Sequence, residues 1–174
     1  WAKVPTDLPE FEEAEKAVNA EIDRLLNIKG KRSVDSIHKE LGHIMWEYVG
    51  MGRTAEGLKE GLKKMHELEK EFDTNLFVPG KKEGLNVELD KAIHLRDFFT
   101  MGELVAFDAL SRNESCGGHF REEYQTEEGE AKRDDENYFY VGCWEYKGKG
   151  NEPELIKEPL EYEAIKVQTR NYKN

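Results

Sequence analysis

The sequence predicts a mainly α-helical fold, a helical bundle followed by a small C-terminal β-hairpin. Apolar residues recur every three or four positions in four segments that together span residues 9 to 113. Glycine, proline and helix-capping residues separate these segments. Short aromatic and apolar alternation, the pattern of β-strands, occurs only beyond residue 137.

The first expected helix begins at Pro9, because proline costs little in a first helical turn, and it ends before Lys29-Gly30. Its apolar residues fall on one face, which makes it amphipathic. They are Phe11, Ala14, Val18, Ile22 and Leu25.

The second and third helices each follow a residue that can cap a helix. Ser33 precedes the second helix, which ends at Gly50, and Thr54 precedes the third, which ends at Asp73-Thr74-Asn75. Each has one apolar stripe, and the other face of the third is rich in Lys and Glu. The two stripes are Ile37, Leu41, Ile44, Met45 and Tyr48, then Leu58, Leu62, Met65, Leu68 and Phe72.

The fourth helix, at about residues 86–113, has apolar side chains on more than one face. A helix that is apolar around most of its circumference is typically buried on most sides. We therefore expect it to be the central and most buried helix of the bundle.

The last third of the chain is expected to contain a loop and a hairpin. Residues 122–137 hold eight Asp or Glu residues and few apolar ones, which indicates a solvated loop. The hairpin is predicted from residues 138–146, a turn at 147–150 and a second strand at 162–167. The acidic run lacks the alternating ligands and central glycine of a calcium loop.

Composition restricts the functional classes. The chain has 26 Lys and Arg against 37 Asp and Glu, a formal charge of −11, which disfavours binding to nucleic acid and anionic lipid. No apolar stretch approaches the roughly 20 residues of a membrane-crossing helix. Two cysteines, Cys116 and Cys143, offer a single possible disulfide, so we expect a reducing cytoplasmic location.

The N-terminal residues Trp1 to Asp7 have the pattern of a linker, which suggests a fragment of a larger protein. We expect three regions. Residues 1–32 form a linker and helical extension, 33–121 the helical bundle, and 122–174 an acidic loop and hairpin tail.

The candidate functional segment is residues 112–123, which combines a helix stop with a histidine and two arginines. Gly117-Gly118 allows a sharp turn and leaves backbone N–H groups beside His119 and Arg121. His119 and Arg121 could form polar contacts with another domain. They could equally have an internal role and tie the loop to the fourth helix. A thiolate–imidazole pair of Cys116 and His119 is a third alternative, although no orienting residue is evident.

Two further patterns point to packing rather than binding. His38 and His43 are five residues apart, about 500° around a helix, so their directions diverge by roughly 140° and they cannot share one metal ion. Of the four methionines, Met45, Met51, Met65 and Met101, three lie in or beside apolar stripes, where filling gaps in the core is their ordinary role.

Two motifs give the chain a resemblance to the C-terminal domain of the flavoprotein subunit of fumarate reductase and succinate dehydrogenase. One resembles that family's Arg-x-Glu-Ser-Arg-Gly-Ala-His-x-Arg-x-Asp pattern and the Arg-Asp-Asp-x-Asn run after it. The other, Met45 to Thr54, resembles the family's Met-Trp-x-x-x-Gly-x-x-Arg helix end. The residues that match the first pattern are Arg112, Glu114, Ser115, Gly117, His119 and Arg121, then Arg133-Asp134-Asp135-Glu136-Asn137.

The resemblance covers residues 33 to 170, with departures at the turn. Cys116 stands where the family has arginine, Gly118 where alanine is common and Glu123 where aspartate is typical. One cationic contact expected at this turn is therefore absent.

The resemblance implies an antiparallel bundle with a three-helix core like a spectrin repeat, plus an N-terminal helix. In this interpretation the parent enzyme binds FAD and interconverts fumarate and succinate, and the chain itself holds no catalytic, cofactor-binding or metal-binding residue. Its expected partners are the flavin and capping domains of the same subunit and the iron–sulfur subunit, with no nucleic acid and no membrane insertion. The expected location is the inner face of the membrane, peripheral, through partner subunits. The expected domain-interface residues are Arg112, Glu114, Ser115, His119 and Arg121.

Two alternatives stay open at this stage. L-aspartate oxidase and adenylylsulfate reductase carry a comparable helical appendix, so the parent could be one of these flavoproteins. The other alternative is a stand-alone helical interaction module without an oxidoreductase parent.

Overall fold

The computed structural model describes residues 3, 5–148 and 150–168, which form two compact units. The first unit ends at Leu110 and the second begins at Ser111. Outside the described residues lie Trp1, Ala2 and Val4 of the predicted linker, Lys149 of the predicted turn and residues 169–174 of the predicted tail.

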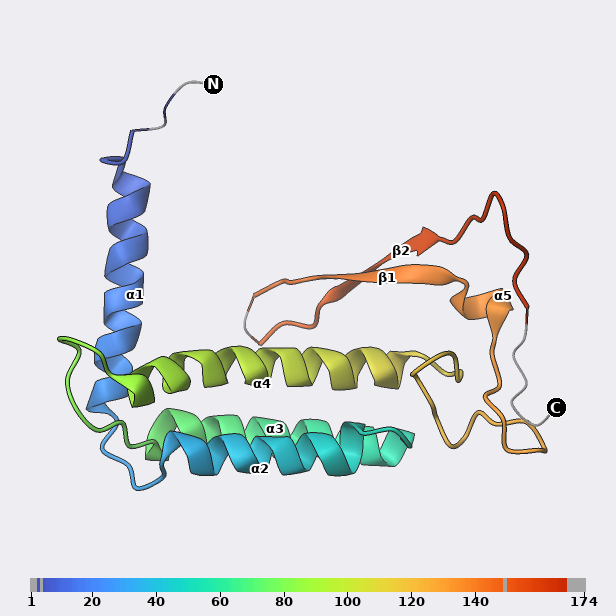
Figure 1. Cartoon of the computed structure of the whole chain (residues 1–174), viewed down its shortest axis with the longest axis horizontal. Helices are drawn as coiled ribbons and strands as arrows, with labels where there is room; N and C mark the ends of the chain where they lie inside the picture. Colours follow the sequence, from blue (N-terminus) through green and yellow to red (C-terminus); the bar gives the residue numbers. More distant parts are fainter. Residues whose placement is uncertain (1–2, 4, 149, 169–174) are drawn as a thin grey trace. The chain divides into compact units, whose positions relative to one another are not determined.

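Three long helices of the first unit lie side by side: α2 (Val34–Val49), α3 (Ala55–Asn75) and α4 (Val87–Ser111) (Figure 1). The second and third begin where the sequence predicts, because the capping side chains are in place. The hydroxyl of Ser33 accepts a hydrogen bond from the backbone N–H of Ser36, and that of Thr54 accepts one from Gly57. The predicted antiparallel helical bundle is confirmed.

Contacts between α3 and α4 show that these two helices run in opposite directions. Asp73, near the end of α3, lies 2.6 Å from Arg96 in the first half of α4, whereas His66 lies 2.8 Å from Glu103 further along α4. The core between the helices is aliphatic, with one aromatic pair, Phe72 and Phe99, whose ring centroids are 5.8 Å apart. Core members from the three helices include Ile37, Leu41, Leu58, Met65, Leu68, Leu95 and Ala106.

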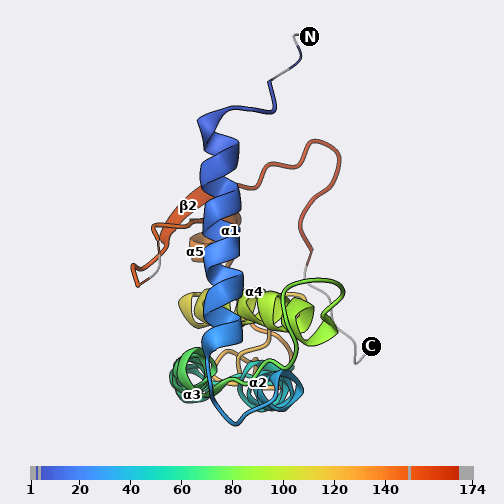
Figure 2. The same ribbon diagram turned by 90° about the vertical axis from the view of Figure 1, so that its left-hand side faces the viewer.

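Helix α1 (Pro9–Asn27) stands across one end of the other three helices (Figures 1 and 2). The predicted helix is confirmed, with Pro9 in its first turn. Only the C-terminal part of its apolar stripe meets the core, through Leu25, which is fully buried, and Ile22. Phe11 and Val18, on the same stripe, are 51% and 60% exposed.

The expectation that the fourth helix is buried on most sides is wrong. One face of α4 is buried, but Phe98, Met101 and Val105 are 48%, 56% and 41% exposed. The physical reason is that α2 and α3 pack against one side of α4. Its buried face carries several small residues, among them Ala92, Gly102, Ala106 and Ala109. A Cβ at Gly102 would lie 3.1 and 3.2 Å from the sulfur atoms of Met45 and Met65, so this face leaves room for side chains of the neighbouring helices.

The second unit contains the short helix α5 (Asp135–Tyr138) and a two-stranded antiparallel sheet of β1 (Tyr140–Glu145) and β2 (Glu154–Pro159). The predicted hairpin is confirmed, but its second strand lies at Glu154–Pro159 and not at 162–167. In the observed register Trp144 faces Leu155 and Cys143 faces Ile156. This strand has only two consecutive apolar residues between charged ones, so the alternation that marks a strand is weak in its sequence.

Among the described residues, no helix has both the length and the apolar character that crossing a membrane requires.

Candidate docking turn in the second unit

Residues Arg112 to Arg121, here called the docking turn, reverse direction at the two glycines. Cys116 and His119 pair through two backbone hydrogen bonds of 2.8 and 3.0 Å. Gly117 has a φ of 59°, whereas Gly118 is not among the positive-φ glycines. A positive φ at the first central residue alone corresponds to a type II′ turn, in which that position is typically glycine. The sharp turn predicted at Gly117-Gly118 is confirmed.

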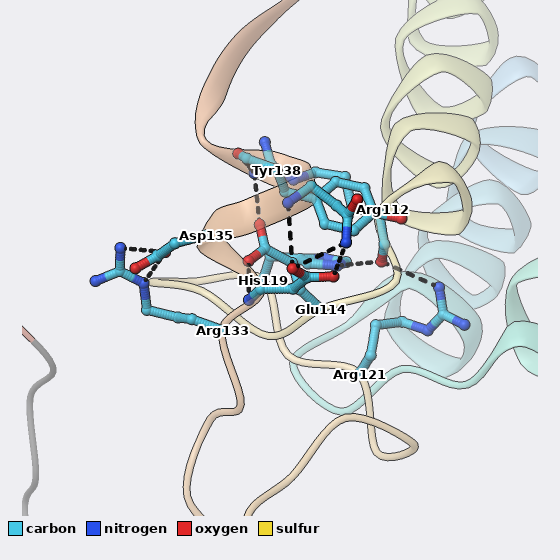
Figure 3. Close-up of polar contacts among 9 residues, drawn as sticks. Arg112, Glu114, His119, Arg121, Arg133, Asp135 and Tyr138 are labelled. Atoms are coloured by element: carbon cyan, nitrogen blue, oxygen red, sulfur yellow. Dashed lines mark hydrogen bonds and ion pairs between the residues drawn. The ribbon is translucent and has the colours of Figure 1, made fainter. Parts of the chain in front are cut away.

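The carboxylate of Glu114 connects the start of the docking turn to the segment before the hairpin. Its Oε1 accepts a hydrogen bond from Arg112 at 2.6 Å, and its Oε2 accepts one from the backbone N–H of Asp134 at 3.0 Å (Figure 3). Glu114 is only 2% exposed. A carboxylate this buried is tolerated because charged and backbone donors satisfy it.

Ser115 and Arg121 close the turn from inside. The Ser115 hydroxyl accepts from the Arg121 backbone N–H at 2.8 Å and donates to the Arg121 carbonyl at 3.1 Å. The Arg121 side chain, 1% exposed, pairs with Glu123 at 3.1 Å and lies over the ring of Tyr124. A buried guanidinium that is paired and stacked in this way is a fixed part of the unit.

His119 and Arg121 both donate to one backbone carbonyl, that of Arg112, directly after the last residue of α4. The distances are 3.1 Å from His119 Nε2 and 3.4 Å from an Arg121 terminal nitrogen (Figure 3). Because a carbonyl can only accept, Nε2 of His119 carries the hydrogen. Carbonyls at the end of a helix have no intrahelical partner and carry partial negative charge, so cationic and N–H donors suit this position.

The Arg112 guanidinium reaches toward the hairpin. It donates to the Tyr138 carbonyl at 3.1 Å and lies 5.8 and 5.6 Å from the ring centroids of Tyr138 and Tyr140. Lys157 of β2 lies 4.5 Å from the Tyr140 centroid. The Tyr140 ring therefore makes cation–π contacts with two side chains, Arg112 and Lys157, that come from different segments.

A second ion pair continues the cluster at Arg133. Its side chain pairs with Asp135, and the Nε–Oδ1 distance is 2.9 Å. This hydrogen bond raises the pKa of the Arg133 guanidinium; burial partly opposes the effect, and the charge of Asp135 adds to it. Asp134 caps α5 by accepting from the backbone N–H of Asn137.

The structure brings the five predicted interface residues, Arg112, Glu114, Ser115, His119 and Arg121, into one cluster. Three of them are buried, namely Glu114, Ser115 and Arg121. Sequence reasoning missed Tyr138 and Tyr140, which it assigned only to a strand. A separation of more than 25 residues left no local signal that Arg112 would lie on these rings.

Two other functions can be considered from the sequence: a thiolate–imidazole pair of Cys116 and His119, and metal binding by His38. The structure places these histidines in other contacts. The imidazole of His119 contacts the backbone carbonyl of Arg112, and two hydrogen bonds join the backbones of His119 and Cys116. His38 is stacked on Phe98 with ring centroids 5.0 Å apart. Within the described part of the chain, no group of three or more His, Cys, Asp or Glu side chains is arranged to hold a metal ion.

The second motif, Met45 to Thr54, forms the corner between α2 and α3. The Arg53 Nε donates to the carbonyls of Val49 and Gly50 at 3.1 and 3.0 Å, at the end of α2. Burial lowers the pKa of this guanidinium, and the charge of Asp108 on α4 partly opposes that. Both motifs therefore fix the ends of helices.

The described residues do not fit an FAD site. Dinucleotides bind where a parallel strand enters a glycine-rich turn and then the N-terminus of a helix. Here the glycine turn follows the C-terminus of α4, and the sheet of the second unit is an antiparallel pair.

A three-helix bundle, a turn held by hydrogen bonds after its last helix and a small hairpin together define a mainly helical domain. The chain belongs to the fumarate reductase flavoprotein C-terminal family, whose model matches residues 38–172. This match confirms the resemblance carried by the two motifs.

The relatives include two kinds of flavoenzyme. The fumarate reductase flavoprotein subunit of Proteus vulgaris is 26% identical over 163 residues, which cover 94% of this chain and 25% of that protein. L-aspartate oxidase 2-a from Nicotiana tabacum is 42% identical over 98 residues, 56% of this chain and 15% of that protein. The chain thus spans at most a quarter of the length of these relatives.

The fold also matches a solved structure of E. coli quinol fumarate reductase FrdA, with a TM-score of 0.77 and 24% identity. The match covers 95% of this chain and 27% of that one. At this identity the likeness concerns the fold alone.

Proposed function

We propose that this chain is a docking and bracing domain of a larger FAD-dependent enzyme, whose flavin-binding part it contacts through the docking turn. The observation that carries the proposal is the double donation of His119 and Arg121 to the Arg112 carbonyl. Together with the buried Glu114 it fixes the turn in one conformation, and a surface that is already ordered loses little entropy when it binds.

The proposed parent interconverts fumarate and succinate and passes electrons through an iron–sulfur subunit. The likeness to a fumarate reductase flavoprotein subunit over 94% of the chain supports this reading. In this proposal the assembly lies on the cytoplasmic face of a membrane through its partner subunits. In the relatives this region is a small part of a longer protein. This favours a domain of a larger enzyme over a stand-alone interaction module.

The test is a bulky side chain placed at Gly118 in the parent polypeptide. Gly118 is exposed, and a Cβ there would meet nothing within 4 Å, so Gly118→Trp leaves the isolated chain intact. We expect the parent to lose FAD on gel filtration and to melt at lower temperature, while the 174-residue chain keeps its thermal midpoint. Glu67→Trp, on the exposed face of α3, is the matched control. Equal FAD retention in the two parent variants would contradict the proposal.

An L-aspartate oxidase parent is the second candidate, and the 42% identity to the tobacco enzyme favours it. The parent polypeptide distinguishes the two. Reduction of fumarate with reduced viologen supports the first candidate, whereas reduction of its flavin by L-aspartate supports the second.

A further inference from the structure

The apolar stripe of α1 is covered along only part of its length. Leu25 is fully buried and Ile22 packs against the core, yet Phe11 and Val18 are more than half exposed and Ala14 is exposed as well. These residues recur at three- and four-residue intervals, so they form one continuous face. We call the uncovered part, Phe11, Ala14 and Val18, the α1 stripe.

The uncovered part of α1 has little tertiary packing to stabilise it. The part of α1 before Ile22 has 13 residues, from Pro9 to Glu21, and isolated helices shorter than about 12–15 residues are marginal. Most helical stability in proteins comes from packing of an apolar face. The α1 stripe is therefore a surface that a partner would stabilise.

The direction of α1 is set at its C-terminal end by a ring of four charged residues. Arg24 lies 2.8 Å from Glu21 and 3.2 Å from Asp73 of α3. Arg96 of α4 lies 2.6 Å from Asp73 and 3.1 Å from Glu21. Each guanidinium thus contacts both carboxylates. The ring therefore ties the C-terminal end of α1 to α3 and α4, and the α1 stripe lies on the N-terminal side of the ring.

The relatives are much longer than this chain, so they contain residues outside the matched region that could cover such a stripe. The match to the E. coli FrdA structure includes 95% of this chain, more than the part without α1, and leaves about three quarters of that protein outside the matched region. The stripe is flanked by glutamates, among them Glu10 and Glu15, so its cover should combine apolar side chains with Lys or Arg at the edge.

We propose that the flavin-binding part of the same polypeptide packs on the α1 stripe, as a second contact besides the docking turn. This inference rests on the proposed function. The ring of Glu21, Arg24, Asp73 and Arg96 then positions the stripe, and the partner surface is apolar with a basic edge.

Neighbouring substitutions in the intact parent polypeptide test the proposal. Val18→Glu puts a carboxylate on the stripe, and Asn19→Glu puts the same group on an adjacent exposed position outside it. We expect Val18→Glu to lower the thermal midpoint of the flavin-loaded parent by about 3 °C or more relative to Asn19→Glu. In the 174-residue chain the two variants should melt together, because Val18 is exposed there.

Three outcomes overturn the proposal. The first is equal melting of both variants in the parent. The second is a deficit that appears only when a purified iron–sulfur subunit is added. The third is a stripe-dependent dimer of the isolated chain on gel filtration. The Gly118→Trp experiment is independent, so failure of the docking turn can be separated from failure of the stripe.

Discussion

Single residues of the docking turn act through their backbone as much as through their side chains. The Arg112 carbonyl receives His119 and Arg121, while the Arg112 guanidinium binds Glu114 and lies on two tyrosine rings. Sequence spacing was enough to predict the turn, because Gly117-Gly118 is a local signal. It could not predict that Glu114 would bind the backbone N–H of Asp134, because Asp134 lies twenty residues away in sequence.

Removal of the Glu114 carboxylate should destabilise the second unit. Glu114→Ala leaves the Arg112 guanidinium and the Asp134 N–H without this acceptor, at a cost of about 3 kcal/mol. Hydrogen exchange measured by mass spectrometry should show faster exchange in peptides from residues 111–160. Glu136→Ala, at an exposed position, is the control and should leave exchange unchanged. Equal protection in both variants would show that the buried carboxylate contributes little.

The two glycines of the turn should differ in their tolerance of alanine. Gly117 has a φ of 59°, so Gly117→Ala forces an L-residue into a strained region and should cost about 1–3 kcal/mol. Gly118→Ala has open space and no positive φ, and should be close to neutral. Urea unfolding of the two variants measures the difference. A neutral Gly117→Ala would exclude the type II′ turn in solution.

Helices were more predictable than their surroundings. Their caps and periods are local, so the beginnings of α1, α2 and α3 follow from the sequence. Which apolar face is covered depends on neighbours, and this explains why α4 is more exposed than expected and why the apolar residues in the first half of α1 are exposed. The second strand was placed wrongly because Leu155-Ile156 has charged residues on both sides.

Two glycines within helices, Gly61 and Gly42, should respond oppositely to alanine. The first substitution tests helix packing and the second tests intrinsic helix propensity. A Cβ at Gly61 of α3 would lie 2.7 Å from the Cβ of Tyr48 on α2, so Gly61→Ala should force the two helices apart and destabilise by about 1–2 kcal/mol. A Cβ at Gly42 of α2 would meet nothing within 4 Å, so Gly42→Ala should stabilise by about 0.5–1 kcal/mol. Thermal melts of the 174-residue chain test the opposite signs. Stabilisation by both would mean that the α2–α3 contact is looser than described.

The charged ring at the base of α1 should make stability depend on salt. Asp73→Asn removes the carboxylate that both Arg24 and Arg96 contact, and should cost about 1–2 kcal/mol at low ionic strength. The loss should shrink in about 1 M NaCl, because partly exposed charges are screened. Asp90→Asn, whose partner His94 is 3.9 Å away on the exposed side of α4, is the control. Denaturation at two salt concentrations compares the variants, and an equal loss at both would rule out a charge effect.

At the scale of the whole molecule, both family motifs hold helix ends rather than form a reactive centre. Arg53 closes the end of α2, and the docking turn caps the carbonyl after α4. The family could be predicted from the sequence because these motifs are contiguous. The proposed surfaces toward other parts of the parent could not, since they depend on residues outside this chain.

Gel filtration of the 174-residue chain with equimolar FAD tests the central claim, that this chain supports redox chemistry without performing it. We predict that flavin absorbance elutes with free FAD and is absent from the protein peak. Stoichiometric flavin absorbance in the protein peak would contradict the account, because the chain would then contain a flavin site of its own.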